Sequence, residues 1–250
     1  MAMWSGCISF GLVTIPVQLY AATEERGAGF HQVHTCGGRI RHRRVCQRED
    51  REVPQDEILR GWEAPDGRTV VLSDEDLDRL PLPTKRVAEV LGFVGDQDVD
   101  PITYATPYYA GPDGGAAQRP YALLVAALAR HGMVALCKVT LRTRERLAVL
   151  RPHRGVLVLH TLRWPQEVRD PGDLASAAPV TDRELTLAEV LMDTLAGVDL
   201  AELHDDYAEA LEQLVAAKAG NSELAESPTP VPAVDLVAAL EASIRAASGH

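Results

Sequence analysis

The hydrophobic pattern of this 250-residue chain changes period at Trp164-Pro165. Before that point, apolar residues come in short runs and alternations, and the run Val156–Leu159 is typical of a strand buried on both faces. After it, apolar residues recur at the spacing of amphipathic helices. The chain is therefore expected to fold as a β-rich body followed by a helical arm. Its three clearest strands are predicted at Met133–Arg142, Arg146–Arg151 and Gly155–Leu162.

The N-terminal segment Cys7–Tyr20 also favours extended structure, because aliphatic residues alternate with small ones. Proline cannot donate a ladder hydrogen bond, so Pro16 restricts its point of the strand to a sheet edge or a bulge.

Two short helices are predicted within the body. Ser73, with Asp76 three residues later, resembles an N-cap signal for a helix over Asp74–Leu80. The apolar stretch Tyr121–His131 is typical of a helix, and Gly132 is expected to end it.

The arm begins with the clearest helix signal of the chain. Thr181 and Glu184 form a Ser/Thr-x-x-Glu capping box ahead of a helix that is expected to stop at Gly197. A second helix is predicted from Leu200 to Ala219, just before Gly220.

A proline-rich linker over residues 226–232 separates the arm from a short terminal helix, which Asp235 is expected to cap. The predicted division is a β-rich core over residues 1–169, an acidic helical arm over 170–225, and the linker with its terminal helix over 226–250.

The net charge of −11 is distributed unevenly. Residues 1–169 carry +2 and residues 170–250 carry −13, so the two parts are expected to have different partners. Nearly all the cations are arginines, which suit phosphate geometry; a compositional preference for arginine is the alternative explanation.

The clearest basic feature lies in the strand predicted from Met133. Lys138, Thr140, Arg142 and Arg144 alternate there with apolar residues, so one face of a single strand is expected to be cationic and the other apolar. Arg146 and Arg151 follow, and Glu145 is the only acid between positions 138 and 154.

A second basic run has the sequence RIRHRR, in which Arg39, Arg41 and Arg43 share a face if the segment is extended; Arg44 completes it. Rows of arginine at strand spacing can follow a duplex backbone, which they contact without reading sequence. The low aromatic content argues against single-stranded nucleic acid as the ligand, because its bases would need aromatic side chains to stack on. The competing interpretation is that these basic residues form the solvent-exposed outer face of a barrel and pair with acidic residues elsewhere.

Metal and catalytic motifs are weak. His31, His34, Cys36, His42 and Cys46 are zinc-ligand types, but neither cysteine belongs to a Cys-x-x-Cys pair. No nucleophile elbow, phosphate-binding loop or His-Glu-x-x-His motif is present. We therefore expect no enzyme activity, metal or cofactor, and a hydrolase is a minor alternative.

Several segments resemble the prokaryotic Ku family of non-homologous end joining. They are WSGCISFGLVTIPVQLY from Trp4, FHQVHTCGGRIRHRRVC from Phe30, VLSDEDL from Val71, GVLVLHTLRWPQEV from Gly155, HDDY from His204 and the terminal Asp235-Leu236. They occur in the order expected of the family and cover nearly the whole chain.

The resemblance implies a mainly β fold: a Ku-type β-barrel core with short helices, followed by a C-terminal α-helical arm. It also implies a homodimeric ring that threads over a free end of double-stranded DNA and touches only sugar and phosphate. The residues expected to line that ring are Arg39, Arg41, Arg43, Arg44, Lys138, Arg142, Arg144, Arg146 and Arg151.

In related proteins the C-terminal region recruits a multidomain ATP-dependent DNA ligase of the ligase D type. The residues expected to take part here are Tyr207, Leu211, Leu214, Asp235, Leu236 and Leu240. The sequence departs from the family pattern in two places. Cys46 lacks the second cysteine of a Cys-x-x-Cys pair, so zinc is not expected. The 250 residues contain no Lys/Ala/Pro-rich tail after the terminal helix, so DNA bridging that depends on such a tail is not expected. The alternative function is a degenerate Ku-like adaptor that docks the ligase and binds DNA weakly.

The expected location is the cytoplasm, in association with the nucleoid. No apolar run approaches the roughly 18 residues that span a bilayer, and no basic residue precedes the N-terminal apolar stretch as in a secretory signal. Four scattered cysteines fit a reducing compartment better than a disulfide framework.

Overall fold

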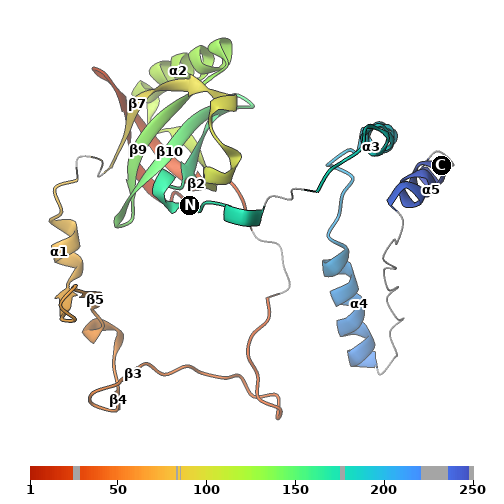
Figure 1. Ribbon diagram of the computed structural model, residues 1–250. Helices are drawn as coiled ribbons and strands as arrows, with labels where there is room; N and C mark the ends of the chain where they lie inside the picture. The colour runs from red at the N-terminus through yellow and green to blue at the C-terminus, as the bar shows by residue number, and fades with distance from the viewer. Residues whose placement is uncertain (25–28, 83, 85, 175–177, 221–235, 248–250) are drawn as a thin grey trace. The chain divides into compact units, whose positions relative to one another are not determined.

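The computed structural model describes residues 1–24, 29–82, 84, 86–174, 178–220 and 236–247 (Figure 1). The chain divides into two compact units. One contains Met1–Glu25 and His31–Asp170, and the other contains Arg26–Phe30 and Pro171–His250. No helix among the described residues is long and apolar enough to cross a bilayer.

The first unit is built around a closed barrel with the strand order β1-β2-β8-β11-β10-β9-β7. Every neighbouring pair is antiparallel except β1 and β7, which run parallel. The mainly β core with short helices is thus confirmed, and the predicted strands are present with shifted ends. The barrel strands are β1 (Trp4–Phe10), β2 (Val13–Ala21), β7 (Val87–Gly95), β8 (Tyr104–Pro112), β9 (Met133–Leu141), β10 (Arg144–His153) and β11 (Val156–Leu162).

The segment Cys7–Tyr20 is not one strand: β1 and β2 are joined by a tight turn at Gly11, whose φ is 57°. Pro16 lies in β2, one residue before pairing with β8 begins at Val17. Proline has no N–H group to donate, and at this position no hydrogen bond to β8 is required of it. This agrees with the predicted restriction to a sheet edge.

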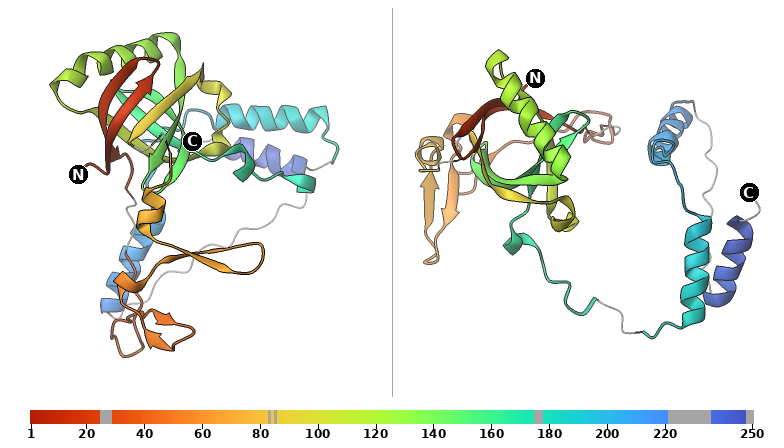
Figure 2. Two further views of the ribbon diagram at one scale, coloured as in Figure 1. Left: turned by 90° about the vertical axis from the view of Figure 1, so that its left-hand side faces the viewer. Right: turned by 90° about the horizontal axis from the view of Figure 1, so that it is seen from above.

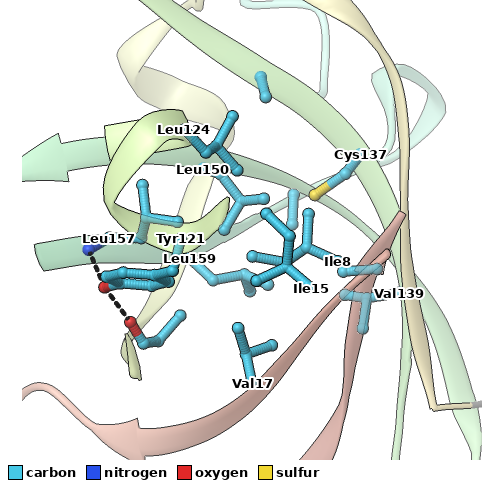
Figure 3. Close-up of a cluster of buried hydrophobic side chains, with 14 of the residues drawn as sticks. Ile8, Ile15, Val17, Tyr121, Leu124, Cys137, Val139, Leu150, Leu157 and Leu159 are labelled. Carbon is cyan, nitrogen blue, oxygen red and sulfur yellow. Dashed lines mark hydrogen bonds between the residues drawn. The ribbon is translucent and has the colours of Figure 1, made fainter. Parts of the chain in front are cut away.

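The barrel interior is filled by inward-pointing aliphatic side chains from every strand, and Figure 3 shows part of this cluster. In β9 the odd-numbered residues Cys137 and Val139 point inward and are fully buried. Each such side chain contributes about 1.5–3 kcal/mol when it leaves water. The alternation read from the sequence therefore identified the core face of β9.

Helix α2 (Gln118–His131) closes one end of the barrel with Tyr121, Leu124 and Leu128 (Figures 1 and 3). It begins three residues before the predicted start and ends, as predicted, at Gly132, which adopts the left-handed conformation. The Tyr121 hydroxyl donates to the Ala110 carbonyl oxygen at 2.6 Å and accepts from the Leu157 amide at 2.8 Å (Figure 3). This side chain therefore joins two strands to the helix.

A long excursion, residues 22–86, connects β2 to β7. None of its described residues from 22 to 82 is buried, so this segment has no hydrophobic core of its own. The predicted N-cap at Ser73 is confirmed, and Asp76 completes a capping box with it, although the helix ends at Asp78 and not at Leu80. The excursion contains β3 (Val45–Cys46), β4 (Arg51–Glu52), β5 (Arg60–Glu63), β6 (Thr69–Leu72) and α1 (Asp74–Asp78).

Short 3-10 helices connect several of these elements: η1 (Gln55–Glu57), η2 (Asp96–Asp98), η3 (Pro101–Thr103), η4 (Gly115–Ala117), η5 (Pro165–Glu167) and η6 (Gly172–Leu174).

The second unit contains α3 (Asp182–Thr194), α4 (Asp206–Gly220) and α5 (Leu236–Ala247) (Figures 1 and 2). The capping box of Thr181 and Glu184 is confirmed at the start of α3. Helices α3 and α5 lie in contact, with an ion pair between Arg183 and Glu241 at 3.1 Å.

The prediction that the second arm helix begins at Leu200 is wrong, because α4 begins at Asp206. The Asp199 carboxylate accepts from the Ala201 amide at 2.9 Å, and the Asp205 carboxylate accepts from the Ala208 amide at 3.1 Å. The Asp199 side chain thus stabilises a turn, and the Asp205 side chain caps the helix that follows. These local hydrogen bonds delay the start of the helix to Asp206. The predicted linker 226–232 and the cap Asp235 lie outside the described residues.

Candidate nucleic-acid interface

The basic residues after Lys138 do not form one strand. Leu141 pairs with Arg144, so Arg142 and Thr143 make a two-residue hairpin loop between β9 and β10. Arg142 has a φ of 59°, a conformation usually left to glycine or asparagine in such loops. The sequence carries no such turn residue there, and the expectation of a continuous cationic row from Lys138 to Arg144 is wrong.

The outward face of β9 is largely occupied by contacts. The Thr140 side chain is buried, with its hydroxyl 2.8 Å from the hydroxyl of Thr84. Lys138 lies 3.9 Å from the Glu145 carboxylate and 5.6 Å from the centre of the Trp164 ring. Its charge is therefore partly compensated before any ligand arrives.

Arginines gather instead at the open end of the barrel, opposite α2. Ala148 and Leu150 point into the barrel, so Arg146, two residues earlier, points the same way. It is half-buried and lines a recess together with the exposed Arg142 and Arg163.

Arg163 was missed by the sequence interpretation. It directly follows β11, and Leu162 at the end of β11 pairs with Leu147 at the start of β10. A hairpin pairing between the strands predicted at residues 146–151 and 155–162 would have placed Arg163 beside Arg146.

Arg151 is not brought together with the other arginines. It lies seven residues beyond Arg144 on β10, roughly 20 Å away at strand spacing. Its guanidinium pairs with Asp96, donates to the Tyr104 hydroxyl at 2.6 Å and lies 5.1 Å from the centre of that ring. Burial raises the pKa of Tyr104, against the opposing effect of Arg151. These contacts give Arg151 a structural role on the outer wall.

The second basic run lies on the excursion as an exposed segment ahead of β3. Arg39 forms a backbone bridge with Val33, and Arg43 lies 3.4 Å from Glu52 in an exposed pair that contributes little stability. Among the carboxylates of the described residues, none pairs with the remaining arginines of the two groups. They are Arg39, Arg41, Arg44, Arg142, Arg144 and Arg146.

The excursion that carries the second basic run is attached to the barrel at the end where the other arginines lie. β2 ends at Ala21, beyond the Trp4–Leu19 pair, and β7 begins at Val87, which pairs with Cys7. The excursion therefore leaves and rejoins the barrel at its open end. Arg60 of β5 donates to the Thr143 hydroxyl at 3.4 Å, which joins the β5–β6 hairpin to the β9–β10 loop.

The histidines and cysteines of the excursion do not assemble a metal centre in the described part of the chain, where no three ligating side chains come together. The closest pair is His34 and Cys36, whose Nδ1 and Sγ atoms are 3.1 Å apart.

The predicted partner-binding residues lie on α4 and α5. Tyr207, Leu211 and Leu214 follow one another at helical spacing on α4, and they are exposed, buried and half-buried respectively. Leu236 is the first residue of α5, and Leu240 on the same helix is half-buried.

Comparison with known proteins places this geometry in context. A family model described as the Ku70/Ku80 beta-barrel domain matches residues 9–187. Proteins named "Non-homologous end joining protein Ku" are 46% identical in Streptomyces griseus over 252 residues and 49% identical in Frankia casuarinae over 253 residues. Each alignment covers 98% of this chain but 64% of the relative.

A protein with the same name in Archaeoglobus fulgidus is 38% identical over 250 residues, and the alignment covers 98% of both chains. The chain thus spans about the whole length of this relative but less than two thirds of the two longer ones.

Proposed function

This chain belongs to the Ku family, and on that premise we propose that it binds the ends of double-stranded DNA without sequence preference, as a homodimeric ring in non-homologous end joining. The observation that carries the proposal is the group of arginines at the open end of the barrel, which form no ion pair with a carboxylate of the described residues. The arginine-rich excursion leaves from the same end. Arginine without a carboxylate partner is available to neutralise phosphate and release counterions.

The described residues of the excursion form no hydrophobic core, which indicates that another molecule stabilises this segment. Ordering each residue costs about 1–2 kcal/mol of backbone entropy, which burial normally offsets. No residue described between positions 22 and 82 is buried. Contact with duplex DNA and with a second copy of the chain would supply the missing stabilisation.

The test is a mobility-shift assay with linear duplex and a covalently closed circle of the same sequence. A ring that admits only free ends retards the linear DNA and leaves the circle unbound. Sedimentation of the purified protein should give a dimer. Equal capture of circles, or a strict monomer at working concentrations, would overturn the proposal.

We further propose that the second unit recruits the ATP-dependent DNA ligase of end joining, of the ligase D type. Support comes from the aromatic residue Tyr207, which is 67% exposed on α4. Such a residue is typical of an interface anchor. Tyr207→Ala should weaken capture of the purified ligase and leave DNA-end binding unchanged. Leu200→Ala, an exposed apolar residue outside the helices, is the control.

A further inference from the structure

The open end of the barrel contains a recess of about 430 Å³ whose charged lining residues, in the part of the chain that the structure describes, are all arginines. It lies at the end opposite α2, between the start of β1, the β9–β10 loop and the end of β11. Three arginines line it, and no carboxylate of the described residues does. The lining residues that matter are Trp4, Tyr108, Arg142, Arg146, Thr161 and Arg163.

Arg146 is the residue that points to a ligand. Its side chain enters the barrel mouth and is half-buried, yet it forms no ion pair with any carboxylate of the described residues. A guanidinium withdrawn from water is costly unless an anion compensates it. Arg142 and Arg163 add two further cations at the rim.

The walls of the recess are firmly held. The Trp4 indole donates to the Thr140 carbonyl oxygen at 3.1 Å, which fixes the ring at the mouth. The Thr161 hydroxyl accepts from the Thr106 amide at 2.9 Å and donates to the Thr106 carbonyl oxygen at 3.1 Å. The charged groups that line the recess are guanidinium donors, which require a ligand rich in acceptor oxygens.

We propose that this recess binds a phosphate monoester, an inference that rests on the proposed function where the phosphate belongs to DNA. A monoester offers three terminal oxygens and nearly two negative charges. It therefore matches three guanidinium groups better than a single carboxylate ligand would. Leu19, Tyr108 and Leu141 line the same recess within the barrel mouth. A monoester carries one substituent and presents three oxygens to the guanidinium groups, whereas an internal phosphodiester is flanked by sugar on both sides and presents two.

Two sources carry this chemistry: the terminal 5′ phosphate of a DNA end, and a free phosphomonoester. The first experiment uses inorganic phosphate as the probe, titrated calorimetrically into the full-length protein against chloride of equal ionic strength. The wild type should bind phosphate, and Arg146→Gln should bind about ten- to hundredfold more weakly, as expected for the loss of a charged hydrogen-bond partner.

The matched control is Arg154→Gln, which removes one exposed arginine from the β10–β11 turn at the other end of β10. It should bind phosphate as the wild type does. Arg163→Gln is a second test, because its exposed side chain can be changed without disturbing the core. No phosphate binding above chloride, or equal affinity in the wild type, Arg146→Gln and Arg163→Gln, overturns the inference.

A second experiment distinguishes the sources by comparing wild-type binding of 5′-phosphorylated and 5′-hydroxyl duplexes. Tighter binding of the phosphorylated duplex, with competition by inorganic phosphate, assigns the recess to the DNA end. Equal binding of the two duplexes, with phosphate binding intact, assigns it to a free phosphomonoester. Failure to bind either duplex would refute the proposed function while the phosphate titration still tests the recess.

Discussion

The indole nitrogen of Trp4 donates a hydrogen bond to the carbonyl oxygen of Thr140 at 3.1 Å, across 136 positions of sequence. This bond joins the first strand of the barrel to β9 at the mouth where the arginines gather. The ring lies against Gly6, and a Cβ atom at that position would be 2.3 Å from both the Trp4 ring and the Arg86 carbonyl oxygen. Glycine at position 6 therefore allows the close approach that shapes the mouth.

Replacement of Gly6 by alanine should destabilise the protein. The added methyl group must displace either the indole or backbone, and overpacking of this kind costs about 1–3 kcal/mol. Chemical denaturation measures the loss. Gly92→Ala is the control, because a Cβ there meets nothing within 4 Å. Equal stability of the two variants would contradict the packing argument.

Tyr121→Phe should destabilise the barrel by about 1–3 kcal/mol per group left unpaired. It removes the hydroxyl that satisfies the Ala110 carbonyl oxygen and the Leu157 amide, both in the core. Tyr20→Phe removes an exposed hydroxyl that donates to the Gln18 side chain and should change stability by less than about 0.5 kcal/mol. A thermal or urea transition of Tyr121→Phe that matches the wild type would refute this role.

Stability should fall as the pH rises from about 9 to about 12. Burial raises the pKa of the Cys137 thiol from the usual 9.0 to about 12, so the folded state binds more protons than the unfolded chain in that window. The free energy of unfolding therefore decreases with pH there, and the contribution is fully present below pH 9. Cys137→Ala should flatten the slope measured by urea unfolding at several pH values.

Val139→Ala controls for lost packing in that experiment, because Val139 is also fully buried in β9 but has no titratable group. It should lower stability and keep the wild-type slope. A slope unchanged by Cys137→Ala would show that another group is responsible.

The double variant Arg142→Glu and Arg144→Glu should abolish DNA-end binding and leave the fold intact, because both side chains are exposed at the β9–β10 loop. The matched control is Arg119→Glu with Arg130→Glu, which makes the same change in net charge on exposed positions of α2. Mobility shifts and circular dichroism separate binding from folding. Comparable affinity of the two double variants would remove the loop from the DNA surface.

Binding of DNA ends should depend steeply on salt. With about 6–10 phosphate contacts, affinity should fall by about 10³–10⁵ between 50 and 200 mM salt, because counterions are released from the duplex. Fluorescence anisotropy over a salt series measures the slope. A flat response would argue against a backbone interface made of arginine.

Much of the local structure could be predicted from neighbouring residues. The capping boxes at Ser73 and Thr181 and the stop at Gly132 were read directly from the chain, because each signal acts within a few positions. The break between β9 and β10 was predicted, but its place at Arg142 was not, because an arginine with positive φ gives no compositional warning.

The sequence by itself determined the strand-rich body, the helical arm, the inward face of β9 and membership of the Ku family, since these follow from periodicity and from a long consecutive signature. Tertiary structure alone decided which cations are free. Arg151 is engaged by Asp96 and Tyr104, whereas Arg146 lines a recess at the barrel mouth together with Arg163 and Trp4. Pairing of a charge depends on strand register and barrel closure between residues far apart in the chain, and a local pattern contains neither.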